Sequence, residues 1–263
     1  MTDGDYDWTC YRHAGREAGV KCRRCERPIC PDCMISAPVG FQCPGCVKGA
    51  PKVRTVRSLG GEPYVTYALI AVNVALFVAG IGRDQAVRLG IDGPDVAHGD
   101  WWRLVTSGFL HFDLFHIGFN MLLLWWLSTQ VGLERTLGRL RFGILYAVAL
   151  LSGSLGVLLL DPRSLTGGAS GAVFGLMGAA AVIMRRRGID VMQSGLGGLI
   201  LINLLFSFRP GVSIGGHLGG LVGGGIAGAI YAGTDDERLG TVACVLVGVA
   251  VAAASLWVAR HPL

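Results

Sequence analysis

Charged residues are scarce in this sequence. Only 16% of the 263 residues are Asp, Glu, Lys or Arg, whereas 52% are hydrophobic, and the mean hydropathy is +0.52. A soluble domain carries about 25% charged residues, so the composition excludes an ordinary soluble globular protein. We expect an integral, multi-pass membrane protein made of α-helices.

Two further features are missing. The first residues, MTDGDYDWTCYRH, are acidic and polar and contain neither a basic region nor an apolar core, so we expect no cleaved signal peptide and a cytosolic N-terminus. The net charge of +5 comes from short basic clusters beside apolar segments, with no basic stripe interleaved with aromatic residues. This pattern excludes a nucleic-acid partner and indicates membrane orientation instead.

The apolar residues gather in seven segments, several of them long enough to cross a hydrocarbon layer of roughly 30 Å. They predict six or seven spans, and we prefer seven: about 64–82, 114–131, 140–160, 170–184, 192–208, 213–232 and 239–259. Arginines follow the second and fourth segments, as the positive-inside rule requires for a cytosolic N-terminus. Arg209 and the acidic run at 234–238 do not follow this pattern. We expect the plasma membrane of a prokaryote.

Many of the 41 glycines lie inside the apolar segments. Small residues let membrane helices approach one another closely. We expect Gly171 and Gly175 of the fourth segment to face Gly219 and Gly223 of the sixth, in a close helix crossing.

Ser170 and His217 are predicted to lie at a similar depth in the membrane. The fourth segment spans roughly 22 Å, so Ser170 should lie about 8 Å below the outer surface, and His217 about 6 Å below it. A serine is a weak nucleophile until a base takes its proton, and a neutral histidine can do so. The pair is therefore predicted to be a nucleophile and its base, although a membrane serine is more often bonded to its own backbone.

His116 and Asn120 are four residues apart and so share one helix face. They are candidate donors for an oxyanion, and the alternative is that they hydrogen-bond two helices together. His111 and Asp113 are expected at a solvated membrane edge. Since no acidic residue is placed at depth to orient His217, we predict a dyad and not a triad.

Residues 64–235 resemble the rhomboid intramembrane serine proteases. The similarity rests on five sequence pieces: Trp102-Arg103, His111 to Asn120 (HFDLFHIGFN), Gly132-Leu-Glu134-Arg135, Gly168 to Gly175 (GASGAVFG) and Gly216-His217-Leu-Gly-Gly. The resemblance implies a six-helix bundle, to which the seventh segment adds a C-terminal transmembrane helix.

The resemblance also implies roles for individual residues. Ser170 would be the nucleophile and His217 the general base, and Asn120, His116 and the Ser170 backbone N–H would form the oxyanion hole. Phe174 would stack on the histidine, with Gly168 and Gly171 in supporting positions. Trp102, Arg103, Glu134 and Arg135 would be structural. The implied partners are transmembrane protein substrates that enter from the lipid bilayer, and catalysis would need no cofactor.

Seven of the eight cysteines lie before residue 47 and, with one histidine, form four pairs with metal-ligand spacing. Eight ligands suffice for two structural zinc ions, and a redox role is the less favoured alternative. The spacing resembles B-box zinc fingers, although the last pair here lacks the usual histidine. That resemblance implies a cross-braced pairing, with one site formed by Cys10, His13, Cys30 and Cys33 and the other by Cys22, Cys25, Cys43 and Cys46.

We therefore predict four parts: a cytosolic zinc-binding domain (1–47), a basic linker (48–62), a protease core (63–235) and an additional C-terminal transmembrane helix (236–263). The favoured function is an intramembrane serine endopeptidase, with the zinc domain binding a cytosolic protein partner. The alternatives are a proteolytically silent adaptor that binds transmembrane clients and a transporter with broken helices. The adaptor is disfavoured because Ser170 and His217 are both present, and the transporter because midplane carboxylates are scarce.

Overall fold

The computed structural model describes residues 8–37, 39–48 and 61–261. Its internal contacts divide the chain into two compact units, residues 1–59 and 60–263.

The N-terminal unit contains two small antiparallel sheets. Strand β1 (Val20–Lys21) pairs with β2 (Pro28–Ile29), and β3 (Ile35–Ser36) pairs with β4 (Phe41–Gln42), so that Val20 lies opposite Ile29 and Ile35 opposite Gln42. A 3-10 helix, η1 (Pro31–Cys33), and helix α1 (Pro44–Lys48) complete the unit. Its buried core is Ile29 together with five cysteines, a core that is too small to stabilise a fold without further links.

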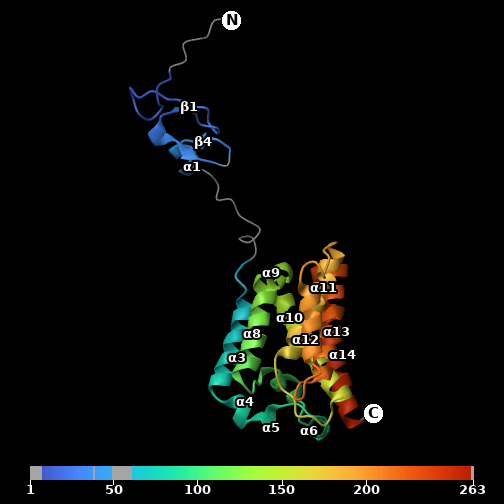
Figure 1. Ribbon diagram of the computed structural model, residues 1–263. Helices are drawn as coiled ribbons and strands as arrows, with labels where there is room; N and C mark the ends of the chain where they lie inside the picture. The colour runs from blue at the N-terminus through green and yellow to red at the C-terminus, as the bar shows by residue number, and fades with distance from the viewer. Residues whose placement is uncertain (1–7, 38, 49–60, 262–263) are drawn as a thin grey trace. The chain divides into compact units, whose positions relative to one another are not determined.

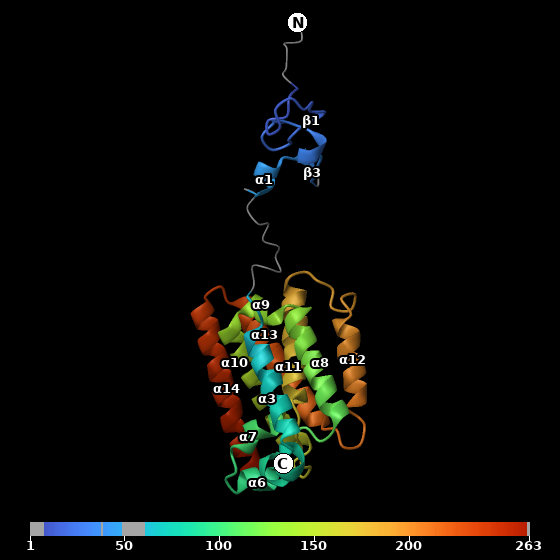
Figure 2. The same ribbon diagram turned by 90° about the vertical axis from the view of Figure 1, so that its left-hand side faces the viewer.

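The second unit is a bundle of helices that run side by side (Figures 1 and 2). Seven helices coincide with the seven apolar segments: α3 (Tyr64–Val78), α8 (Leu114–Thr129), α10 (Arg139–Leu160), α11 (Ser170–Arg186), α12 (Leu196–Phe206), α13 (Ile214–Gly233) and α14 (Glu237–Arg260). Helix α13 packs most extensively against α11 and α10, and α14 covers α10. The predicted fold class, a six-helix bundle with a seventh C-terminal helix and a small N-terminal domain, is confirmed.

The helices differ in how well they suit a membrane span. Among the described residues, α10 and α14 are each long and apolar enough to cross a bilayer. The pair formed by residues 103–109 and α8, bent by 97°, counts as a third only if the two helices together make one span. The remaining helices of the bundle are shorter or rich in glycine, which lowers their hydropathy. All seven predicted helices are therefore present, but length and composition alone identify only two or three of them as spans.

Helix α13 uses two different rows of glycines to pack against its neighbours. The contacts with α11 pair Gly220 with Gly171 and Gly224 with Gly175. Gly219 and Gly223, which were predicted to face α11, instead face Ser152 on α10. The prediction was wrong by one residue, because consecutive helical residues point about 100° apart and therefore towards different neighbours.

The segment between α3 and α8 folds into short helices: α4 (Ile81–Asp84), α5 (Ala86–Leu89), α6 (Gly93–Ala97), α7 (Arg103–Thr106) and the 3-10 helix η2 (Ser107–Phe109). The buried Arg103 side chain holds this segment together. Its guanidinium lies 2.6 Å from the Asp95 carboxylate and 3.0 Å from that of Asp100, and it donates to the Gly90 carbonyl oxygen at 2.7 Å. Neighbouring Trp102 is partly exposed and donates its indole N–H to the Arg88 carbonyl oxygen.

A buried carboxylate connects the opposite end of the bundle. Glu134, in α9 (Leu133–Leu137), accepts hydrogen bonds from the backbone N–H groups of Val65 and Thr66, both at 2.9 Å, and from the Thr66 hydroxyl at 2.7 Å. It therefore satisfies N–H groups in the first turn of α3, which have no partner within that helix. The next residue, Arg135, has a buried Nε atom that contacts no acceptor in the described part of the chain.

Candidate active site

Ser170 is the first residue of α11. The loop before it is attached to the segment between α3 and α8, because Thr166 forms a bridge with Ile91 and the Gly168 N–H donates to the Ser107 carbonyl oxygen at 2.8 Å. The N-cap position of α11 is Ala169, which has no side chain that could cap the helix. The N–H groups of the first turn therefore have no side-chain cap, and they form the positive end of the helix dipole.

His217 lies in the first turn of α13, and a cluster of hydrogen bonds fixes the start of that helix. The Ser213 hydroxyl accepts from the Gly216 N–H at 2.9 Å and donates to the Asp161 carboxylate at 2.6 Å. The same carboxylate oxygen accepts from the Gly215 N–H at 3.0 Å. Asp161 is the C-cap residue of α10, so these bonds fix the start of α13, and with it His217, relative to α10.

Two side chains hold the imidazole of His217. The ring of Phe174, from the second turn of α11, stacks on it with centroids 4.2 Å apart and an interplanar angle of 19°. On the ring edge, Nδ1 lies 2.6 Å from the hydroxyl oxygen of Ser207, the C-cap residue of α12. The aromatic residue was predicted from the sequence, whereas the serine was not. A sequence signal for Ser207 does exist. Asn203 and Ser207 are polar residues four apart on one helix face, and the same spacing singled out His116 and Asn120.

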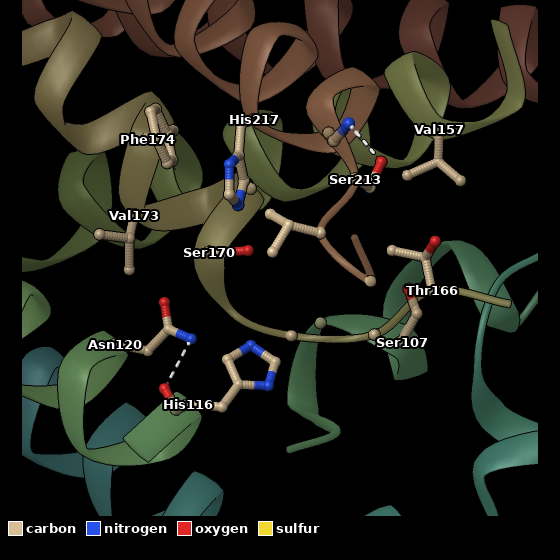
Figure 3. Close-up of a pocket in the computed structure, with 18 of the residues that line it drawn as sticks. Ser107, His116, Asn120, Val157, Thr166, Ser170, Val173, Phe174, Ser213 and His217 are labelled. Carbon is tan, nitrogen blue, oxygen red and sulfur yellow. Dashed lines mark hydrogen bonds between the residues drawn. The ribbon is translucent and has the colours of Figure 1, made fainter. Parts of the chain in front are cut away.

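Asn120 and His116 face Ser170 from helix α8 (Figure 3). The Asn120 amide donates to the His116 carbonyl oxygen of its own helix at 3.0 Å, so this bond does not hold two helices together. Gly168 permits the close approach of His116, because a Cβ at this position would lie 2.6 Å from His116 Nε2. Its φ of +141° also disfavours any other residue.

His111 departs from its expected position. We expected it at a solvated edge, but its side chain is 1% exposed and its ring lies 4.9 Å from that of His116. Neither ring nitrogen has a hydrogen-bond partner within the described residues. Asp113 is exposed, as expected, and caps α8 by accepting from the His116 N–H at 2.8 Å.

One open pocket of about 830 Å³ contains all the residues predicted to act in the membrane region. They are Ser170, His217, Asn120, His116, Phe174, Gly168 and Gly171. Figure 3 shows the Ser170 hydroxyl below the His217 ring, with Asn120 and His116 on the opposite side. No hydrogen bond joins Ser170 to His217 in the described chain, and such bonds are often long before a substrate is bound. Phe112, Phe115, Phe119 and Phe206 add apolar walls.

The cysteines of the N-terminal unit gather into two four-ligand groups. One contains Cys10, His13, Cys30 and Cys33, and the other Cys22, Cys25, Cys43 and Cys46, with all ligand atoms of a group within 4.8 Å of one another. His13 Nδ1 lies 3.2 Å from Cys30 Sγ, and the sulfur atoms of Cys25 and Cys43 are 3.7 Å apart. Tetrahedral coordination with metal–sulfur bonds of about 2.3 Å places sulfurs about 3.8 Å apart, so both groups could hold a metal ion.

Backbone N–H groups favour the thiolate form that binds metals. Burial raises the pKa of Cys22, but N–H donors from Cys43, Arg24 and Cys25 outweigh it and lower that pKa to about 6. The Cys43 N–H lies 3.2 Å from the Cys22 sulfur. Similar donors lower the pKa of Cys10 to about 6. Each group thus contains at least one cysteine that is prepared for coordination.

The apolar helices and the pocket within their bundle define an integral, all-α membrane protein. The Rhomboid domain family model matches residues 98–234, and the chain belongs to the rhomboid family. It is 33% identical over 206 residues to Rhomboid protease GluP of Bacillus subtilis (strain 168), covering 73% of this chain and 40% of that protein.

Two further relatives are eukaryotic. RHOMBOID-like protein 4 of Arabidopsis thaliana is 32% identical over 149 residues, with 54% of this chain and 37% of the relative covered. Rhomboid-like protease 2 of Toxoplasma gondii is 29% identical over 182 residues, with 62% of each covered. The chain therefore spans less than two thirds of the length of each of these relatives.

Proposed function

We propose that this protein is an intramembrane serine endopeptidase that cleaves peptide bonds in or near the transmembrane helices of membrane proteins. The observation that carries the proposal is the convergence of Ser170, at the uncapped start of α11, and the Phe174-stacked His217 on one open pocket. GluP, to which the chain is similar, is named a protease.

The proposed reaction has two stages. Ser170 Oγ attacks the substrate carbonyl carbon, while its proton moves to His217 Nε2. The C–N bond then breaks, His217 protonates the departing amine, and an acyl ester remains on Ser170. In the second stage a water molecule gives a proton to His217 and attacks the ester, which releases the acid and returns the proton to Ser170.

The oxyanion of each tetrahedral intermediate needs hydrogen-bond donors, which act most strongly where water is excluded. The Ser170 N–H, at the start of α11, and the side chains of Asn120 and His116 are the proposed donors. The phenylalanines of the pocket wall are suited to an apolar substrate segment, and transmembrane helices that enter from the lipid bilayer are the proposed substrates.

The test is cleavage of a fluorescent single-span substrate by purified protein in liposomes. We expect product from the wild type and none from Ser170→Ala or His217→Ala. Ser255→Ala is the control, since Ser255 is a buried helix serine away from the pocket, and its hydroxyl donates to the Val251 carbonyl oxygen of α14. Equal turnover by all four proteins would refute the assignment. Binding without turnover by the wild type, across several substrates, would favour the alternative of a proteolytically silent adaptor.

For the N-terminal unit we propose two structural zinc ions, one in each ligand group. Cysteine and histidine ligands in closed, four-coordinate groups suit Zn²⁺, and no ligand position is left for a substrate. We further propose that this unit lies on the cytosolic side of a prokaryotic plasma membrane, where it binds a protein partner and not nucleic acid. The arginines after α8 and α11 support that orientation.

A further inference from the structure

A further polar side chain, that of Ser207, contacts His217. It lies at the end of α12, is 2% exposed, and its hydroxyl oxygen is 2.6 Å from His217 Nδ1. The hydroxyl also lies 3.0 Å from the carbonyl oxygen of Asn203, one helical turn earlier. Ser207 thus connects His217 to a helix that carries neither Ser170 nor His217.

Taken together, these two contacts favour one position for the proton on the imidazole. A carbonyl oxygen can only accept a hydrogen bond, so the single O–H of Ser207 is used in donating to Asn203. The lone pairs of the Ser207 oxygen are then left to accept, and the partner at 2.6 Å must supply a hydrogen. A neutral imidazole carries one N–H, so a hydrogen on Nδ1 leaves Nε2 as the acceptor.

We propose that Ser207 is a positioning residue, which holds His217 as the Nδ1–H tautomer so that Nε2 can take the Ser170 proton. This inference rests on the proposed protease function. Phe174 alone cannot fill the role, because a 180° rotation of the imidazole about its Cβ–Cγ bond keeps the stacking but exchanges Nδ1 with Cδ2 and Nε2 with Cε1. The bond to Ser207 removes this freedom. No carboxylate within the described residues hydrogen-bonds the ring, and the nearby Asp161 is engaged by Ser213 and Gly215.

The position of Ser207 also predicts how its loss acts. Its hydroxyl oxygen contacts His217, and Ser207 is not among the residues that line the pocket, so its removal should impair activation of the nucleophile and leave substrate binding unchanged. A hydrogen bond of ordinary strength corresponds to roughly a tenfold change in rate.

The experiment compares full-length wild type, Ser207→Ala, Ser207→Thr and Ser255→Ala in liposomes. Ser255 is the matched control because it is equally buried and also bonds the carbonyl oxygen four residues earlier, but lies on α14, away from the pocket. Two quantities are measured: kcat and KM for the single-span substrate, and the rate at which a fluorophosphonate probe labels Ser170. The probe reports nucleophile activation without substrate recognition.

We expect Ser207→Ala to lower both kcat and the labelling rate about tenfold, with KM unchanged. Ser207→Thr, which keeps the hydroxyl, should restore both, and Ser255→Ala should match the wild type. Wild-type rates in Ser207→Ala, or equal losses in Ser207→Ala and Ser255→Ala, would overturn the inference. Absence of labelling and turnover in the wild type itself would refute the proposed function, and the role of Ser207 with it.

Discussion

The crossing of α11 and α13 should tolerate no side chain at Gly220, although the neighbouring Gly225 should accept one. Gly220 lies one turn beyond His217, and a Cβ there would lie 2.7 Å from the carbonyl carbon of Gly171 and closer still to its oxygen. Ordinary contacts of a Cβ begin near 3.4 Å. The Gly220→Ala protein must therefore move α13 away from α11 by more than half an ångström.

The two substitutions are matched in chemistry and differ in their surroundings. At Gly225 the nearest atom to a new Cβ is a Val182 methyl carbon at 4.0 Å, so alanine fits without movement. Each replacement gains up to about 1 kcal/mol from helix propensity. At Gly220 that gain is opposed by about 1–3 kcal/mol of overpacking. The displacement also moves His217 relative to Ser170, and a misplacement of about 1 Å can lower the rate 100-fold.

The assay is the liposome cleavage rate, measured together with the thermal unfolding midpoint in detergent. We expect Gly220→Ala to lose at least about tenfold in kcat and to unfold at a lower temperature. Gly225→Ala should keep its kcat and unfold at the same or a higher temperature. Wild-type activity and stability in Gly220→Ala would show that the backbones can separate without consequence, and would refute the argument from close helix approach.

Three other substitutions or treatments test separate parts of the structure. Asp161→Ala should lower kcat and reduce the free energy of unfolding by about 1–2 kcal/mol. Asp236→Ala, which removes the N-cap of the remote helix α14, should lower stability alone. Equal kcat values in these two variants would contradict the role of Asp161 in fixing α13. Glu134→Gln should destabilise the bundle by about 2–3 kcal/mol in chemical unfolding, and Glu237→Gln, at an exposed ion pair, should not. Chelation should unfold the N-terminal unit, as measured by circular dichroism and metal release. Cleavage by a chain of residues 55–263, which lacks this unit, should be unaffected by the chelator. Loss of that cleavage would indicate a catalytic metal.

The helices could be predicted from the sequence because their cause is local. Runs of apolar residues interrupted by Gly, Pro and Arg are sufficient to define the seven helices. The chemically active residues were recognisable for a similar reason, since polar groups such as Ser170 and His217 are rare and conspicuous in apolar runs. The two metal-ligand groups were also recognisable, because their members occur in closely spaced pairs along the chain.

Contacts between helices could not be predicted in the same way. Whether Gly219 or Gly220 faces α11 depends on a rotation of about 100° about the helix axis, and the apolar pattern of α13 is too even to fix it. Ser207 was missed because its significance depends on the position of α12 beside α13. His111 was misplaced because the segment before α8 turns by 97° and buries it.

The arrangement of helix starts supports the assignment of Ser170 as the nucleophile independently of any motif. Three helices, α8, α11 and α13, begin at the pocket, and each directs the positive end of its dipole there. Asp113 caps α8, and Asp161 accepts from the first turn of α13, so a carboxylate already compensates two of the three. The start of α11 has no such partner. The only one of these helix starts without a carboxylate is therefore at Ser170, where a negative charge would develop during acyl transfer.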